Sequence, residues 1–202
     1  MVLKVKLSAN GAIESTRIKR GITAEDLYNK YRDKLPYDAV IAMVNNHIKP
    51  LDSIIDEDST VEFLDITNNQ AYLSYQSSLT MLLMKAANAV LDGQAGMKVR
   101  ASINDGLYML FDTPVDEEQI AKMYQRMKKL VEDDIPIIAR EFTKEEGKKL
   151  LEEEGLEDKS RLLNRLASDE TIKIYSLDGY SEFFYNYLVP STGYLKTFEL
   201  IR

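Results

Sequence analysis

The sequence predicts an α+β protein with two domains, a small one over residues 1–66 and a larger one over residues 67–202. Three observations support this prediction. Short runs in which apolar and polar residues alternate, typical of strands, are interleaved with stretches whose apolar residues recur at helical spacing. The chain has 202 residues, 45% of them hydrophobic, which is enough to bury a sizeable core. A polar, turn-prone stretch at residues 67–70 separates the two sets of elements.

The first domain is predicted to open with a β-hairpin, because the Asn10-Gly11 pair separates two alternating runs and is a strong hairpin signal. Thr23 is the expected N-cap of a helix, with Asp26 three residues later, and that helix stops before Pro36. The predicted strands are residues 3–7, 12–18, 39–44 and 61–66. These elements indicate one sheet with the helix on one of its faces.

The second domain is predicted to mix helices with an antiparallel sheet. The predicted helices are residues 78–91, a long helix capped by Asp116 and Gln119, a short helix capped by Thr143 and Glu146 that ends at Gly155, and residues 158–166. The predicted strands are residues 97–103 and 107–111, which form a hairpin around Asn104-Asp105-Gly106, and residues 135–142, 171–177, 183–189 and 194–201.

Composition excludes several classes of protein. The chain has no cysteine, so disulfides, thiolate nucleophiles and thiolate-bound metals are excluded. A net charge of −7 does not favour nucleic-acid binding, although local basic groups occur. We interpret these groups as solvated surface: Arg17, Lys19, Arg20, Lys122, Arg126, Lys128 and Lys129. No apolar stretch approaches the roughly 20 residues of a membrane span, and residues 1–7 indicate a strand rather than a signal peptide. We therefore expect a cytoplasmic protein that contacts no membrane.

The first domain also carries a family resemblance. The segment Gly21-Ile-Thr-Ala-Glu-Asp-Leu27 begins the predicted helix, and Ala42-Met-Val-Asn-Asn46 and Val61-Glu-Phe63 lie on or beside strands. With these segments, residues 1–66 resemble the TGS domain, a β-grasp module found on threonyl-tRNA synthetases and on some GTPases and stringent-response enzymes. The resemblance implies a β-grasp fold for this domain.

From residue 77 onward, the order of helix, hairpin, long helix and C-terminal strands is similar to the editing domain of threonyl-tRNA synthetases. That family uses His-x-x-x-His on the first helix and Cys-x-x-x-His near the last strands. The resemblance places these four positions on Ser77, Met81, Phe184 and Leu188. Such side chains hold no metal and move no proton at neutral pH. The sequence therefore predicts a degenerate editing site with no catalytic residue and no metal.

Three C-terminal segments, residues 157–163, 177–180 and 188–195, resemble the N-terminal half of bacterial nucleoside kinases of the uridine kinase type. The resemblance implies a parent protein whose downstream P-loop domain, a partner in cis, uses ATP and Mg²⁺. The sequence contains no G-x-x-x-x-G-K-[ST] motif and ends where that domain is expected, so we expect a fragment or a shortened relative that itself needs no cofactor.

This resemblance favours a non-catalytic regulatory or ligand-binding module of such a kinase. Two other readings stay open: a free-standing RNA- or tRNA-binding adaptor related to threonyl-tRNA synthetase, and a residual metal-independent hydrolase.

The C-terminal aromatic residues suggest where a ligand could bind. Eight tyrosines and phenylalanines occur between residues 175 and 198, and strand alternation would place about half of them on each face of a sheet. One alternative is that they simply pack in the core and on the sheet surface. The other is a partly collapsed editing pocket that accepts a nucleoside or nucleotide effector. The rim of that cleft would consist of Tyr108, Tyr180, Tyr187, Ser191 and Thr192. His47, the one histidine, is expected in a surface turn.

Overall fold

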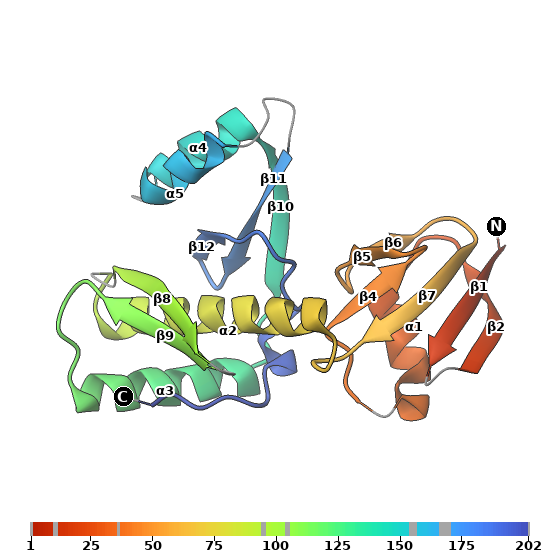
Figure 1. Ribbon diagram of the computed structural model, residues 1–202, viewed down its shortest axis with the longest axis horizontal. Coiled ribbons are helices and arrows are strands. Elements are labelled where there is room, and N and C mark those ends of the chain that lie inside the picture. Colours follow the sequence, from red (N-terminus) through yellow and green to blue (C-terminus); the bar gives the residue numbers. More distant parts are fainter. Residues whose placement is uncertain are drawn as a thin grey trace. The chain divides into compact units, whose positions relative to one another are not determined.

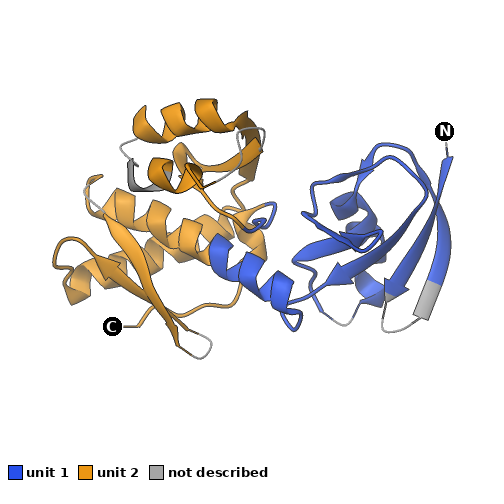
Figure 2. Cartoon of the chain, turned by 45° about the horizontal axis from the view of Figure 1, so that its top comes forward, with its two compact units in different colours: residues 1–78, 186–190 blue, residues 79–185, 191–202 orange. Residues whose placement is uncertain are grey.

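The computed structural model describes residues 2–9, 12–35, 37–93, 96–103, 106–153, 157–165 and 171–201. It separates into two compact units, Met1–Ser78 with Asn186–Pro190, and Leu79–Tyr185 with Ser191–Arg202 (Figure 2). The predicted α+β class is confirmed, because both units combine helix with small sheets. The predicted domain boundary between residues 66 and 67 stays a prediction.

The first unit contains a five-stranded sheet in the order β2-β1-β7-β4-β5 (Figure 1). The neighbours β1 and β7 are parallel, and the other pairs are antiparallel. The short strands β3 and β6 pair separately. The bounds are β1 Val2–Ala9, β2 Ala12–Lys19, β3 Ile22–Thr23, α1 Ala24–Tyr31, the 3-10 helix η1 Arg32–Lys34, β4 Ile41–Val44, β5 His47–Lys49, β6 Ile54–Ile55 and β7 Ser59–Leu64.

Alternation along β1 creates the core of this unit. Leu3, Val5 and Leu7 are buried, while the intervening lysines face solvent. The helix α1 covers the buried face, because the ring of Tyr28 lies edge-on against Phe63 of β7 with 5.5 Å between the ring centroids. The α1 start is as predicted, since the side chains and backbone N–H groups of Thr23 and Asp26 form a reciprocal capping box.

The strands β3, β5 and β6 were not predicted, because each is only two or three residues long. The turn between β4 and β5 uses Asn45 and Asn46, whose φ angles are 50° and 64°. Asparagine tolerates this left-handed conformation better than most residues. His47 follows this turn as the first residue of β5 and is exposed, so it lies on a surface strand rather than in the turn itself.

The helix α2, Asn69–Val90, begins nine residues before the predicted start at residue 78. The side-chain oxygen of Asn68 accepts hydrogen bonds from the backbone N–H groups of Gln70 and Ala71 at 2.9 and 3.4 Å. The polar stretch at residues 67–70 therefore contains a helix cap rather than a loop. None of the helices in the described part of the chain has the length and apolar character that crossing a membrane requires.

The second unit contains the antiparallel sheet β10-β11-β12 and a separate hairpin of β8 and β9 with a bulge between Val99 and Ala101. The α3 cap is as predicted, a box formed by Asp116 and Gln119. The bounds are β8 Met97–Ile103, β9 Gly106–Phe111, α3 Glu117–Glu132, β10 Ile137–Thr143, α4 Lys144–Glu153, α5 Glu157–Leu163, β11 Thr171–Leu177, β12 Tyr180–Phe183 and the 3-10 helix η2 Thr192–Tyr194.

The α4 and α5 helices pack on the three-stranded sheet. Their buried cluster consists of Leu151, Leu163, Ile172, Ile174 and Phe183. The helix α4 approaches β11 very closely at Gly147, where a Cβ atom would lie 2.1 Å from Cδ1 of Ile172. Glycine at this position therefore allows the contact between helix and sheet.

Two predicted C-terminal strands are wrong. The third strand of the sheet is β12, Tyr180–Phe183, which follows a turn at Asp178-Gly179, and not residues 183–189. Among residues 194–201 the structure has a 3-10 turn and irregular backbone instead of a strand. The aromatic alternation misled the prediction, because strand propensity depends on neighbours that the sequence does not show.

Some predicted features lie outside the described residues. These are the turns at residues 10–11 and 104–105, and the helix ends at residues 155 and 166.

Candidate functional site

The segment Asn186–Pro190 belongs to the first unit, together with the beginning of α2. Ser77 Oγ accepts a hydrogen bond from the Asn186 side-chain amide at 2.9 Å. The next residue, Ser78, is fully buried, and its Oγ accepts a hydrogen bond from the backbone N–H of Val189 at 3.0 Å. Ser78 Oγ also donates to the Ser74 carbonyl at 2.7 Å. Two adjacent helix hydroxyls thus fix this segment.

Of the four positions expected to correspond to the editing ligands, three are occupied by packed apolar side chains and one by a hydrogen-bonded serine. Met81 on α2 and Leu188 are buried. Phe184 is half-buried and meets Tyr175 edge-on, with 6.4 Å between the ring centroids. Ser77 holds Asn186. In the described residues no group of three or more His, Cys, Asp or Glu side chains is placed to hold a metal.

Two of the five predicted cleft residues have a structural role that the sequence did not predict. Thr192 is fully buried, and its hydroxyl donates to the Leu130 carbonyl and accepts from the Ile135 backbone N–H at 2.8 Å. Ser191 donates to the carboxylate of Asp134, which also accepts from the Gly193 N–H at 3.0 Å. These hydroxyls fix the turn after α3, so the Thr192 hydroxyl is not free for a ligand.

The tyrosines of the predicted cleft lie on different segments. Tyr108 on β9 has 63% of its surface exposed, whereas Tyr180 on β12 and Tyr187 are half-buried. The Tyr180 hydroxyl lies 3.5 Å from a carboxylate oxygen of Glu182. Tyr108 and Tyr180 belong to the second unit and Tyr187 to the first, so the nucleoside cleft stays a prediction.

Sequence reasoning missed two charged groups of the second unit. Glu182 is buried, and its carboxylate accepts the backbone N–H of Phe183 at 2.8 Å. Lys85 on α2 forms an ion pair with Asp178 at 3.1 Å and also donates to the Asp178 carbonyl, so it fixes the turn between β11 and β12. An acid among aromatic residues, at Ser181-Glu182-Phe183, was the available signal for Glu182.

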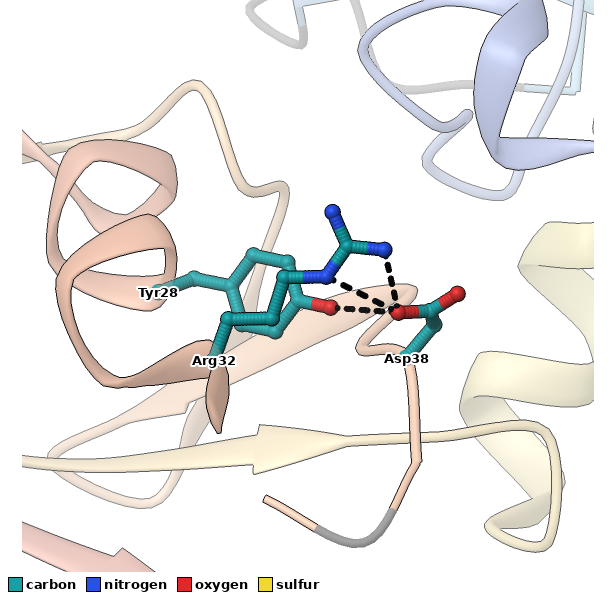
Figure 3. Close-up of polar contacts among 3 residues, drawn as sticks. All are labelled: Tyr28, Arg32 and Asp38. Atoms are coloured by element: carbon teal, nitrogen blue, oxygen red, sulfur yellow. Dashed lines mark hydrogen bonds and ion pairs between the residues drawn. The ribbon is translucent and has the colours of Figure 1, made fainter. Parts of the chain in front are cut away.

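A polar cluster in the first unit joins α1 to the segment before β4. One carboxylate oxygen of Asp38 accepts hydrogen bonds from the Tyr28 hydroxyl at 3.0 Å and from Nε and Nη2 of Arg32 at 3.2 and 2.8 Å (Figure 3). Burial raises the pKa of the Tyr28 hydroxyl above its ordinary value, and the adjacent Asp38 carboxylate raises it further. This cluster fixes the segment before β4 to α1 and to Arg32.

Two of the cations on α3 are ion-paired, and a third lies near an aromatic ring. Lys122 pairs with Glu118 at 2.7 Å, and Lys129 pairs with Asp133 at 2.6 Å. The ammonium of Lys128 lies 5.6 Å from the centre of the Tyr124 ring. The hydrogen bond to Glu118 raises the pKa of Lys122, and the hydrogen bond to Asp133 raises the pKa of Lys129. The α3 surface is thus solvated, as predicted, and the structure adds the two ion pairs.

Comparison with known proteins gives one consistent relationship. No protein-family model matches the chain. The threonine–tRNA ligase 1 of Bacillus subtilis is 29% identical over 197 residues, which cover 95% of this chain and 30% of that protein. The threonine–tRNA ligase of Symbiobacterium thermophilum is 26% identical over 184 residues, or 90% of this chain and 28% of that protein. The chain is distantly related to the N-terminal region of threonyl-tRNA ligases.

The same relationship extends to a Geobacillus threonine–tRNA ligase, which is 28% identical and covers 96% of this chain. The chain spans about 30% of the length of the curated relatives it matches. Among solved structures, a complex of ATBAG1 with HSP70 covers 45% of this chain at a TM-score of 0.32 and 9% identity, which is too low for any inference about fold.

Proposed function

We propose that this chain is a non-catalytic tRNA-binding module that keeps the architecture of a synthetase N-terminal region without its editing chemistry. The observation that carries this proposal is the relationship along 90–96% of the chain to ligases whose names give tRNA as their substrate. Because the similarity extends over nearly the whole chain and not only over one motif, it supports a role for this chain in binding tRNA.

The side chains at the expected ligand positions support the non-catalytic part of the proposal. Hydrolysis of an aminoacyl ester needs a group that activates water, either a metal or a general base within hydrogen-bonding reach. Met81, Phe184 and Leu188 offer neither, and Ser77 has the Asn186 amide as its hydrogen-bond partner rather than a base. Among the described residues, the hydroxyl of Ser77 therefore has no hydrogen-bonded base that would make it a nucleophile.

A regulatory module of a nucleoside kinase stays the second interpretation. It depends on the sequence resemblance of residues 157–163, 177–180 and 188–195 and on the tyrosines of the predicted cleft. In that case ATP, Mg²⁺ and the nucleoside substrate belong to a further domain. A P-loop motif encoded directly after residue 202 would support this interpretation over a free-standing adaptor.

The test of the tRNA-binding role is a fluorescence anisotropy titration of the purified chain against a labelled threonine tRNA transcript. We expect saturable binding that weakens as salt rises from about 50 to about 200 mM, as phosphate contacts require. A flat anisotropy signal at both salt concentrations would refute the proposal. Elemental analysis of the same preparation is expected to find no stoichiometric zinc.

A further inference from the structure

The hairpin of β1 and β2 has one exposed face that is strongly basic. The register pairs Lys4 with Arg17 directly across the two strands, Lys6 with Ser15, and Val2 with Lys19. Directly opposite residues point to the same face of a sheet, and so do residues two apart along a strand. All four cations are exposed. Lys4, Lys6, Arg17 and Lys19 therefore share one surface, which we call the hairpin face (Figure 1 shows β1 and β2).

The one acidic residue of β1 and β2, Glu14, lies on the face opposite the hairpin face. Glu14 pairs in register with Leu7, which is buried, and its carboxylate forms an ion pair with Lys34 at 2.9 Å. Two further acids adjoin the hairpin face. The Asp58 carboxylate accepts a hydrogen bond from the Lys4 backbone N–H at 2.8 Å. Glu62 on β7 pairs in register with Ser8, which is two residues after Lys6 on β1. The cations consequently outnumber their acidic neighbours.

The arrangement of these cations is unfavourable for the isolated fold. Like charges directly opposite each other, as at Lys4 and Arg17, destabilise a strand pair. Their diagonal neighbours Lys6 and Lys19 stand about 7–8 Å away, so the four charges form one compact group. Within the described residues none of the four forms a salt bridge, whereas Lys122 and Lys129 on α3 do. An unpaired basic group in a chain of net charge −7 is suited to an external anion.

We propose that the hairpin face contacts the phosphate backbone of a bound tRNA. This inference rests on the proposed tRNA-binding function and names the surface that carries it. The hairpin face offers three lysine ammonium groups and the Arg17 guanidinium to phosphate oxygens. Such contacts position a nucleic acid without reading its sequence. An anionic membrane is a poorer fit, because stable surface binding also needs inserted apolar groups. Among the described side chains of this face, Val2 is the one large exposed apolar group.

The experiment compares two fourfold variants with the same change in net charge. The hairpin-face variant carries Lys4→Gln, Lys6→Gln, Arg17→Gln and Lys19→Gln, and the control carries Lys122→Gln, Arg126→Gln, Lys128→Gln and Lys129→Gln. In the anisotropy titration at about 0.1 M salt, we expect the hairpin-face variant to bind tRNA at least about tenfold more weakly, and the control to stay within about twofold. The slope of log affinity against log salt should fall by about 3 for the hairpin-face variant, since each lost phosphate contact removes about 0.7–0.9.

A melting curve distinguishes a lost surface from a lost fold. Because the hairpin-face variant removes a like-charge pair, its melting temperature should be equal to or above that of the unaltered chain. If it melts lower, the Arg17→Gln, Lys19→Gln double variant on the edge strand replaces it, with Lys128→Gln, Lys129→Gln as its control.

Each remaining result has a defined meaning. If the unaltered chain binds tRNA and the hairpin-face variant binds equally well, this inference is overturned but the proposed function is not. The same holds if both variants lose binding equally. Absence of tRNA binding by the unaltered chain overturns both. Binding to phosphatidylserine vesicles without binding to tRNA would assign the face to a membrane and overturn both as well.

Discussion

Replacing Ser78 with alanine tests whether one buried hydroxyl fixes the segment Asn186–Pro190 to the first unit. Ser78 Oγ is the acceptor for the backbone N–H of Val189 at 3.0 Å, and both residues are buried. The alanine variant leaves this N–H without an acceptor, and an unsatisfied buried donor costs about 1–3 kcal/mol. The Ser74 carbonyl, which receives the hydroxyl hydrogen, keeps its helical hydrogen bond. For a unit of this size, each kcal/mol lowers the melting temperature by about 4–8 °C.

Ser77→Ala is the matched control, since Ser77 precedes Ser78 on α2 and holds the same segment through Asn186. The contact is partly exposed, so water can replace the lost acceptor and the cost should stay below about 1 kcal/mol. The assay is thermal unfolding together with amide hydrogen exchange at Val189. Exchange at that amide should accelerate about tenfold for each 1.4 kcal/mol in Ser78→Ala. Equal melting temperatures for the two variants, or unchanged exchange at Val189, would refute this reasoning.

Three further predictions concern the second unit. Thr192→Val removes a buried hydroxyl with two hydrogen bonds and should cost about 2–4 kcal/mol in urea unfolding, whereas Thr192→Ser should cost about 1 kcal/mol. Gly147→Ala should destabilise because its Cβ would meet Ile172, and Ile172→Val should recover part of that loss in a double-mutant cycle; additive effects would contradict the contact. Hydrogen bonds from Thr143 lower the pKa of Glu146 below its ordinary 4.5. The stabilisation by the Glu146 carboxylate is therefore present above pH 4.5 and is lost as the pH falls through the folded pKa. The Glu146→Gln variant should differ from the unaltered chain in stability to unfolding at neutral pH, and the two stabilities should converge in acid. A difference that stays constant with pH would contradict the capping role.

Much of the fold could be predicted, because its signals are local. The capping pairs Thr23 with Asp26 and Asp116 with Gln119 lie three residues apart, and both form in the structure as expected. Hairpin strands alternate over many residues, so β1, β2, β8 and β9 were also predicted. The start of α2 was missed because the cap at Asn68 lies in a stretch whose composition is equally typical of a loop.

The C-terminal segment and most of the site could not be predicted, because their partners are distant in sequence. Val189 donates to Ser78, 111 residues away, and Thr192 binds the backbone near the end of α3 instead of a neighbouring strand. The cations on β2 were noted as a sequence cluster, but their grouping with Lys4 and Lys6 depends on the register of the hairpin. The positions Ser77, Met81, Phe184 and Leu188 came from family resemblance alone.

The fate of seryl-tRNA bound to this chain tests the central claim most directly. A threonine tRNA that has been mischarged with radiolabelled serine is incubated with an excess of protein. The fraction of serine still esterified to the tRNA and the fraction of tRNA bound are both measured over time. The account predicts that the tRNA is bound while its ester hydrolyses at the rate seen in buffer, because Ser77, Met81, Phe184 and Leu188 activate no water. Faster hydrolysis that Ser77→Ala abolishes, or a tRNA that stays unbound, would contradict it.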